Sequence, residues 1–293
     1  MTIDVLFPYY GDVDLMKKAV LSVLNQRHKD FRLIVVDDGY PDDSIPGWFE
    51  SLEDDRVSYE RNEKNLGANG NYRKCVGKIE NEIAVVMGAD DIILPNYLEW
   101  VAKTADEYPD VDVFQPGVVT IDEHGAFSNT LVEKMKNFYR PKGSGVRVLK
   151  GEKAAASLLR GAWMYFPSLA WRAEKMKEIN FRPEYNVVQD LTLVLDILMR
   201  GGSILLDDEI AFLYRRHSGS DSSWRALEGT RFAEERDFFE TMSKEMAAIG
   251  WNKASRIAKL HFSSRLHALS LLPKATAKKN KTGMRNLSQH IIK

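Results

Sequence analysis

Apolar residues follow two different spacings along the first 120 residues of the chain. Short, nearly continuous apolar runs, typical of strands covered on both faces, occur in "IDVLFPYY", "FRLIVVDDG", "EIAVVMGADD" and "VDVFQPG", with a more polar strand in "RVSYE". Helical spacing of the apolar residues appears in "DLMKKAVLSVLNQ" and "PNYLEWVAKTADEY". Because strands and helices alternate, the chain is predicted to fold as an α/β protein with an open, mostly parallel sheet.

The second half of the chain is predicted to be more helical. Residues 117–150 are predicted to form a loop or hairpin region, and helices follow in "GEKAAASLLRG" and "QDLTLVLDILMRGG" before a strand in "SILLDDEIAFLYRRH". Residues 224–272 are predicted to be helical, after which Pro273 begins a polar tail. At the start of the first helix, Asp12 or Asp14 is positioned to act as the N-cap.

Two pairs of aspartates, Asp37-Asp38 and Asp90-Asp91, follow predicted buried strands. In an open parallel sheet, ligands bind outside the carboxyl ends of the strands, so both pairs are expected at the ligand-binding edge. Adjacent carboxylates repel each other unless a cation or a proton lies between them, and oxygen ligands suit Mg²⁺ or Mn²⁺. Aspartates at strand ends also close turns in proteins without a metal, and this alternative stays open here.

The composition is that of a soluble globular protein, with 44% apolar and 28% charged residues among 293. Cys75 is the single cysteine, which excludes an intramolecular disulfide and fits a reducing cytosol. The sequence has no apolar run long enough to span a membrane and no signal-peptide pattern at its start. A cytoplasmic location is therefore expected.

Charge is distributed unevenly along the chain. Residues 251–293 contain ten Lys or Arg and no Asp or Glu, whereas residues 1–250 contain 31 basic and 42 acidic side chains. The basic segment lacks interleaved aromatic residues and the body is acidic, which argues against a nucleic-acid partner. Its apolar residues fall largely on one side of a helix, although Arg265 interrupts them; they are Ile257, Ala258, Leu260, Ala268, Leu269 and Leu272.

This pattern predicts that the C-terminal segment docks the protein on an anionic membrane surface, on the inner face of the plasma membrane. The alternative is an ordinary helix that packs on the rest of the protein and is followed by a solvated tail.

Five segments, in order, carry a resemblance to a known family. They are "VLFPYYGDVDLMKKAVLSVLNQRHKDFRLIVVDDG", "NEKNLGANGNYRKCV", "VVMGADDIILPNYLE", "PEYNVVQDLTLVLDIL" and "FLYRRHSGSDS". Together they resemble the family 2 glycosyltransferases, which have the GT-A fold. The resemblance covers roughly residues 3–224. It implies a catalytic domain of residues 1–224, with nucleotide-sugar binding in 1–116 and the acceptor side in 117–224, followed by a helical extension in 225–293.

The resemblance also implies roles for particular residues. Asp190 matches the catalytic base of the family, although a helix N-cap is an equally good explanation of its position. Asp90 and His217 match metal ligands for Mn²⁺ or Mg²⁺, and Asp91 either ligates the metal or fixes the turn. The residues matched to nucleotide binding are Pro8, Tyr10, Asp37, Asn65, Gly67, Asn71, Arg73, Ala89 and Asp90. Gly88 departs from the family pattern, because an aspartate usually stands there.

The aromatic residues Trp163 and Tyr165 in "GAWMYFPS" are candidates for the acceptor site, since sugar rings stack on aromatic faces. Aromatic residues are equally common in protein cores, so this assignment stays open.

The expected function is transfer of a sugar, with inversion, from a UDP- or dTDP-sugar to a hydroxyl of a glycan or a lipid-linked acceptor in cell-surface polysaccharide synthesis. A sugar-phosphate nucleotidyltransferase is a weaker alternative, because the loop "PYYGDVD" has one glycine and no basic residue. A catalytically inactive glycan-binding relative is the second alternative, and Gly88 is the reason for it.

Overall fold

The computed structural model describes residues 1–216, 230–277 and 280–292. Within these residues nine strands form one sheet in the order β3-β2-β1-β4-β8-β6-β9-β5, and β7 pairs with β9. The strands are β1 (Ile3–Tyr9), β2 (Phe31–Asp37), β3 (Val57–Arg61), β4 (Ile83–Val86), β5 (Ile92–Ile93), β6 (Val113–Ile121), β7 (Arg147–Lys150), β8 (Ala170–Arg172) and β9 (Ser203–Arg215). The helices are α1 (Val13–Leu24), α2 (Ser44–Glu50), α3 (Gly67–Val76), α4 (Tyr97–Glu107), α5 (Leu131–Tyr139), α6 (Gly151–Gly161), α7 (Ala173–Ile179), α8 (Gln189–Met199), α10 (Thr230–Ala248), α11 (Asn252–Leu260), α12 (Phe262–Ala277) and α13 (Lys281–Ile292).

The predicted α/β fold is confirmed. Strands β3, β2, β1 and β4 run parallel, whereas the short strand β8 is antiparallel to both β4 and β6. Every residue of β1 is buried, as its continuous apolar run predicts. Asp12 rather than Asp14 caps α1, and its carboxylate accepts a hydrogen bond from Leu15 N at 2.9 Å.

The region predicted as a loop or hairpin contains more regular structure than expected. Strand β6 continues to Ile121, and helix α5 and strand β7 follow it. A capping box of Thr130 and Glu133 starts α5. Helix α5 was not predicted because the Gly and Pro residues of "RPKGSG" that follow it indicated a loop. Its apolar residues Leu131 and Phe138 are exposed.

In the described residues the predicted helical character of 224–272 is found from Thr230 onward, whereas the predicted polar tail from Pro273 is wrong. The chain forms three helices after Trp251, Pro273 lies inside α12, and α13 follows it. His261 separates α11 from α12 with a φ of 27°. Because of this break the expected single apolar face is divided: Ala258 and Ala268 are buried, Ile257 and Leu272 are partly buried, and Leu260 and Leu269 are exposed.

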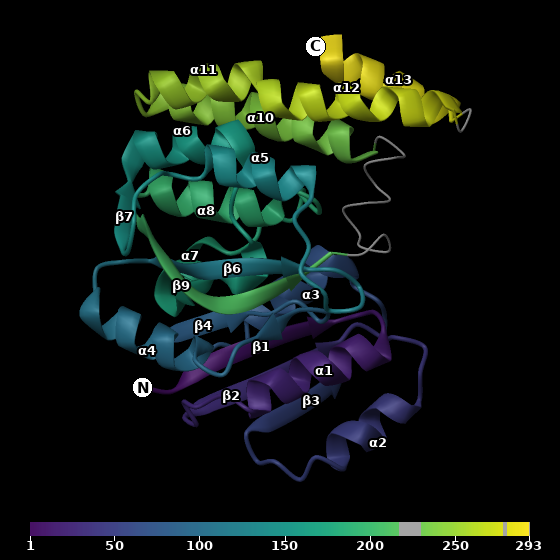
Figure 1. The fold of residues 1–293 in the computed structure, drawn as a ribbon, viewed down its shortest axis with the longest axis vertical. Coiled ribbons are helices and arrows are strands. Elements are labelled where there is room, and N and C mark those ends of the chain that lie inside the picture. Colours follow the sequence, from purple (N-terminus) through teal and green to yellow (C-terminus); the bar gives the residue numbers. More distant parts are fainter. Residues whose placement is uncertain (217–229, 278–279, 293) are drawn as a thin grey trace.

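Helices α10–α13 lie beyond α6 and α8 on one side of the sheet (Figure 1). Phe238, Met242 and Met246 of α10 and Ala254 and Ala258 of α11 belong to the same apolar core as α6 and α8. Helices α10 and α11 are therefore packed into the body of the protein. Docking of the C-terminal segment on a membrane stays a prediction. No helix in the described part of the chain is long and apolar enough to cross a membrane.

Candidate active site

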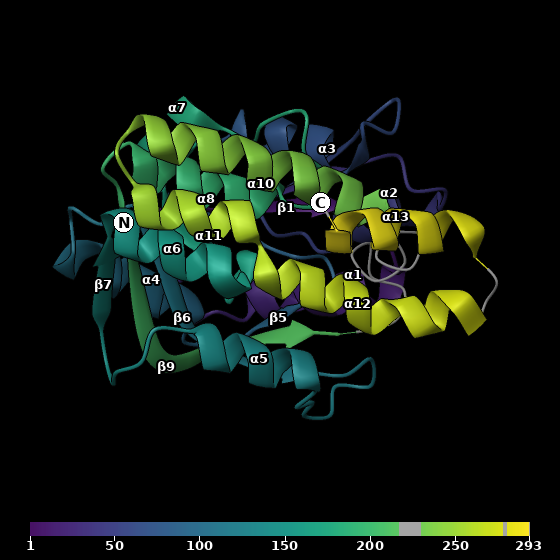
Figure 2. The same ribbon diagram turned by 90° about the horizontal axis from the view of Figure 1, so that it is seen from above.

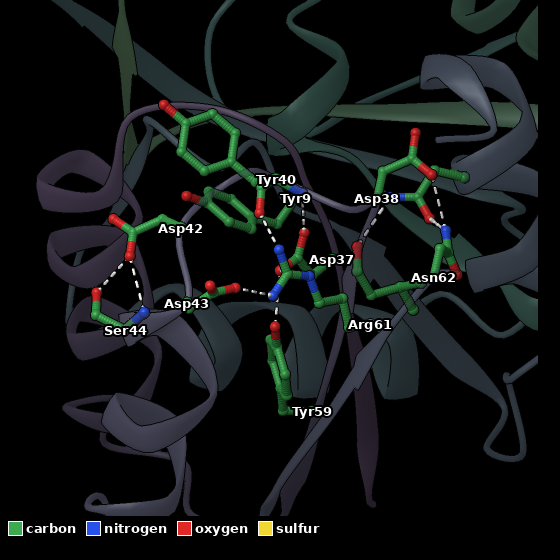
Figure 3. Close-up of polar contacts among 12 residues, drawn as sticks. Tyr9, Asp37, Asp38, Tyr40, Asp42, Asp43, Ser44, Tyr59, Arg61 and Asn62 are labelled. Carbon is green, nitrogen blue, oxygen red and sulfur yellow. Dashed lines mark hydrogen bonds and ion pairs between the residues drawn. The ribbon is translucent and has the colours of Figure 1, made fainter. Parts of the chain in front are cut away.

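Asp37 ends β2 at the carboxyl edge of the sheet and is fully buried. Its carboxylate accepts hydrogen bonds from Tyr40 N at 2.8 Å and from the Tyr59 hydroxyl at 2.7 Å, and Arg61 Nε lies 3.8 Å away (Figure 3). Asp37 therefore closes the turn after β2, which is the alternative given above for aspartates at strand ends. Tyr59 and Arg61 were not predicted, although the parallel register sets Arg61 opposite Asp37. Recognition of a base by Asp37 stays a prediction.

The neighbouring Asp38 ties α3 to the sheet. Its Oδ1 accepts hydrogen bonds from Asn62 Nδ2 and from Leu66 N, both at 2.8 Å (Figure 3). Asn62 also donates to Asn71 Oδ1 at 3.2 Å, and Asn71 Nδ2 donates to Val36 O at 2.9 Å. Asn71 is buried in this network, which favours a structural role for it over the predicted contact with the nucleotide.

Tyr10 is the most open of the residues predicted to recognise a base. Its ring is 56% exposed at the end of β1 and meets the Tyr40 ring edge-on at 5.3 Å between centroids. A planar base has room to stack on such a ring. Pro8, by contrast, is buried within β1 between β2 and β4, so its side chain is covered by the protein.

The turn into α3 brings three further predicted residues to the same edge. Asn65 Oδ1 accepts a hydrogen bond from Gly67 N at 2.9 Å, and Gly67 has a φ of +74°, a conformation that glycine adopts without strain. Asn65 and Arg73 are both exposed. The structure leaves their side chains accessible, and their contacts with a nucleotide stay predictions.

The loop after β4 holds the second aspartate pair and explains Gly88. A Cβ on Gly88 would lie 2.4 Å from Asp91 Oδ2, so the Asp91 carboxylate fills the space that a side chain would need. Asp91 Oδ1 accepts a hydrogen bond from Arg215 N at 2.8 Å, whereas Arg215 Nε donates to the carbonyl of Asp90 at 2.7 Å. These bonds fasten the loop, including Ala89, to the end of β9.

Asp91 Oδ2 is buried and has no hydrogen-bond partner. Burial, followed by the nearby Asp90 carboxylate, raises the pKa of Asp91 well above its usual value. A cation beside these two carboxylates would relieve both effects, so the residues fit a divalent metal. In the described residues no three His, Cys, Asp or Glu side chains are grouped as a metal site. The predicted ligand His217 lies outside those residues.

Asp190, the candidate base, lies in the first turn of α8. Burial raises the pKa of its carboxyl group, while the Leu191 backbone and the Lys136 ammonium oppose this rise. Lys136 Nζ donates a hydrogen bond to Met164 O at 2.5 Å and lies 4.0 Å from the centre of the Tyr165 ring. Burial lowers the pKa of Lys136 to about 7. Lys136 was not predicted because α5 itself was missed.

Tyr72 and Tyr214 lie near both the aspartate loop and Asp190. Burial raises the pKa of Tyr72 and Tyr214, and the negative charges of both Asp90 and Asp190 raise it further. Each phenol therefore lies close enough to both carboxylates to feel their charge. The fold thus brings together two aspartates that are far apart in the sequence.

A pocket of about 350 Å³ opens on the acceptor side, between the end of β6 and α5. Its lining residues are Val118, Val119, Thr120, Phe127, Ser128, Asn129, Glu133, Asn137 and Tyr165. Tyr165 therefore lines a pocket, and its contact with an acceptor stays a prediction. Trp163 is only 1% exposed and donates a hydrogen bond to Ser157 Oγ at 3.0 Å, which favours the core explanation for this residue.

The loop before α8 is held by a residue of the helical extension. Glu234 of α10 accepts hydrogen bonds through Oε1 from the backbone N–H groups of Asn186, Val187 and Val188, at 2.9, 2.6 and 3.0 Å. Asp190 follows immediately along the chain. This contact was not predicted because nothing in the sequence relates α10 to α8.

A mostly parallel sheet with aspartates at its carboxyl edge is the arrangement expected of a glycosyltransferase of the GT-A type. The sequence model of the family described as Glycosyl transferase family 2 matches residues 4–164, more than half of the chain, so the chain belongs to this family.

Particular relatives are distant. An uncharacterized glycosyltransferase of Methanocaldococcus jannaschii is 30% identical over 41% of this chain and 42% of its own length. The glycosyltransferase GlyG of Streptococcus pneumoniae is 23% identical over 84% of this chain and 79% of its own. The crystal structure of S. aureus TarS 1–349 in complex with UDP-GlcNAc aligns with 99% of this chain and 91% of that chain, with a TM-score of 0.61 and 14% identity. At this identity the likeness shows the fold alone.

Proposed function

We propose that this glycosyltransferase transfers a sugar, with inversion, from a UDP- or dTDP-sugar to a hydroxyl of a glycan or a lipid-linked acceptor in cell-surface polysaccharide synthesis. The observation that carries the proposal is that Asp90 and Asp190, 100 residues apart in the sequence, both lie near enough to Tyr72 and Tyr214 for their charges to raise the pKa of each phenol. Direct displacement at the anomeric carbon needs carboxylates that hold a metal at the diphosphate and a separate carboxylate that acts as a base at the acceptor.

Asp190 acts as the general base in this proposal. It takes the proton of the acceptor hydroxyl as the new bond to the anomeric carbon forms. The bond from that carbon to the donor phosphate breaks, and the nucleoside diphosphate leaves with the electron pair. The raised pKa of Asp190 makes it a better base than an exposed aspartate.

Asp90 and Asp91 would hold the Mn²⁺ or Mg²⁺ ion, and His217 is the further candidate from the resemblance. The ion supplies positive charge at the diphosphate leaving group. The buried, unpartnered Oδ2 of Asp91 supports this assignment.

The comparisons support parts of the substrate assignment. Structures of TarS contain UDP and UDP-GlcNAc, which favours a UDP-sugar as the donor. A Campylobacter jejuni relative named GalNAc(5)-diNAcBac-PP-undecaprenol beta-1,3-glucosyltransferase is 31% identical over 36% of this chain and 35% of its own. Its name favours a lipid-linked acceptor.

A thermal-shift panel tests the donor assignment, because a ligand that binds only the folded state raises the unfolding midpoint. UDP-, dTDP- and GDP-sugars are compared with and without Mn²⁺. We expect a shift for the UDP- or dTDP-sugar that is larger with Mn²⁺ and is lost in Asp90→Ala. The matched control is Asp106→Ala, an exposed aspartate on α4.

Donor hydrolysis by the same preparation separates the enzyme from an inactive relative, and release of pyrophosphate from a nucleoside triphosphate with a sugar phosphate would identify a nucleotidyltransferase. The proposal fails if no nucleotide sugar shifts the midpoint or is hydrolysed.

A further inference from the structure

Helix α5 carries large apolar side chains on its outer side. Leu131, Val132, Met135 and Phe138 are all exposed, Leu131 by 75% and Phe138 by 68%. Leu131, Met135 and Phe138 follow the spacing that aligns side chains along one side of a helix. These four residues are called the α5 ridge. An apolar ridge on a helix is costly in water, which indicates that a partner covers it.

The charges beside the α5 ridge are basic. Residues 127–142 contain four basic residues and one acidic residue, Glu133. Lys136 and Arg140 turn inward, where they donate to Met164 O and Asp207 O. Glu133 is buried and forms an ion pair with Arg216. Lys134 and Lys142 are exposed. The partner is therefore expected to combine an apolar interior with negative charge.

A second surface of the same kind lies at the junction of α11 and α12. Leu260, Phe262, Leu266 and Leu269 are exposed, Phe262 by 66%, and are called the α12 ridge. Exposed basic residues of α11 accompany them, namely Lys253, Arg256 and Lys259. Arg265 does not interrupt this ridge, because its guanidinium donates to His261 Nε2 at 3.1 Å and to Ile291 O at 3.4 Å.

In Figures 1 and 2 α5 and the first half of α12 both lie at the outside of the helical layers, and both helices contact α6. From this arrangement we propose that the α5 and α12 ridges together dock the protein on an anionic lipid bilayer. The apolar ridges enter the boundary between headgroups and acyl chains, and the lysines and arginines contact the negative headgroups.

Docking through α5 would set the acceptor side of the site at the lipid surface. The inner side of α5 contributes Glu133 and Asn137 to the pocket that Tyr165 also lines, whereas its outer side is the ridge. An acceptor anchored in the bilayer would then reach the pocket without leaving the membrane. The docking itself is independent of the proposed glycosyl transfer, because vesicle binding is measured without any reaction.

The distribution of charge along the chain favours an anionic bilayer over a second copy of the chain as the partner. Residues 1–250 carry 42 acidic and 31 basic side chains, so the body of the protein repels an anionic surface. A random orientation on that surface would be unfavourable, whereas the two ridges combine large exposed apolar side chains with exposed lysines and arginines. A second copy of the chain would instead bring two basic surfaces into contact.

Co-sedimentation of the full chain with lipid vesicles tests the proposal. Deletion of the extension is unsuitable, since α10 and α11 contribute to the main core. We use Leu131→Gln with Phe138→Gln for the α5 ridge and Phe262→Gln with Leu266→Gln for the α12 ridge. The matched control is Leu21→Gln with Ile210→Gln, which removes two exposed apolar side chains elsewhere. Unchanged thermal unfolding shows that each variant is folded.

We expect the wild-type protein to sediment with phosphatidylglycerol-containing vesicles at low salt, and less with pure phosphatidylcholine or at high salt. Each ridge variant should bind about tenfold more weakly or worse, as expected for losing two apolar side chains from an interface, and the control should bind normally. Wild-type protein that stays in the supernatant, or equal loss in the control, overturns the proposal. So does size-exclusion chromatography that shows a dimer lost in the ridge variants without vesicle binding.

Discussion

Substitution of Glu234 tests whether the helical extension positions the loop before Asp190. One oxygen of its carboxylate accepts hydrogen bonds from three consecutive backbone N–H groups just before α8, the helix that carries Asp190. We expect Glu234→Ala to loosen this loop and to lower kcat, while donor binding at the far side of the site is kept.

The expected loss of stability depends on whether water can replace the Glu234 carboxylate at each of the three N–H groups. Asn186 is exposed and Val187 is partly exposed, so water replaces the carboxylate at both, whereas Val188 is buried. A buried N–H left without an acceptor costs about 1–3 kcal/mol. We therefore expect a loss of about 2 kcal/mol in the free energy of unfolding. A displacement of Asp190 by about 1 Å reduces turnover by up to about a hundredfold.

Steady-state kinetics of transfer and thermal unfolding are measured on the same samples. Glu234→Gln retains an acceptor oxygen at the same position and should recover most of the activity. Glu240→Ala, on the exposed side of α10, removes only an ion pair with Lys244 and is the matched control. The reasoning is refuted if Glu234→Ala turns over as fast as Glu240→Ala, or if donor KM rises as much as kcat falls.

Three further predictions concern the base, the aspartate loop and the extension. Asp190→Asn should retain donor binding but lower the rate of transfer by about a hundredfold or more. In the wild-type enzyme kcat should fall at low pH with an apparent pKa above the usual aspartate range, because burial raises the pKa of Asp190. A kcat that does not change with pH in that region would contradict the assignment. Gly88→Ala should weaken donor binding and lower the unfolding temperature, because the new Cβ would lie 2.4 Å from Asp91 Oδ2. Gly47→Ala is the control in the same binding and unfolding assays, because the space around Gly47 is open. Burial lowers the pKa of His290 from 6.5 to about 4, so its contribution to stability is complete above pH 6.5 and is lost as the pH falls toward 4; urea unfolding midpoints that rise on acidification would show the opposite sign.

The strands that carry the site were predictable because burial on both faces leaves a continuous apolar signature. Strands β1, β2, β4 and β6 all appeared as such runs. Strand β8 has only three residues, and its antiparallel pairing with β4 and β6 depends on contacts far away in the sequence. Helix α5 was missed because the Gly and Pro residues just after it indicated a loop. Helix α12 continues through Pro273, where local rules predict an end.

The candidate site was predictable residue by residue but not as an arrangement. Motif resemblance identified Asp90 and Asp190, yet only the fold shows Tyr72 and Tyr214 in the field of both. Resemblance also does not distinguish a residue that contacts ligand from one that supports the site. Asn71, for example, matches the family pattern, and the structure shows its amide inside the network that holds α3 against β2.

Gly88 shows how the structure changes the meaning of a departure from a motif. In the sequence it removes a carboxylate from the aspartate loop, which was the reason to consider an inactive relative. In the structure the Asp91 carboxylate occupies the space beside Gly88, and a side chain at position 88 would collide with it. Asp91 Oδ2 is also the buried oxygen without a partner. The loop therefore still presents two carboxylates, Asp90 and Asp91, and the glycine is what allows the second one to point inward. Gly88 is therefore no longer a reason to expect an inactive protein, and the proposed metal site rests on Asp90 and Asp91 together.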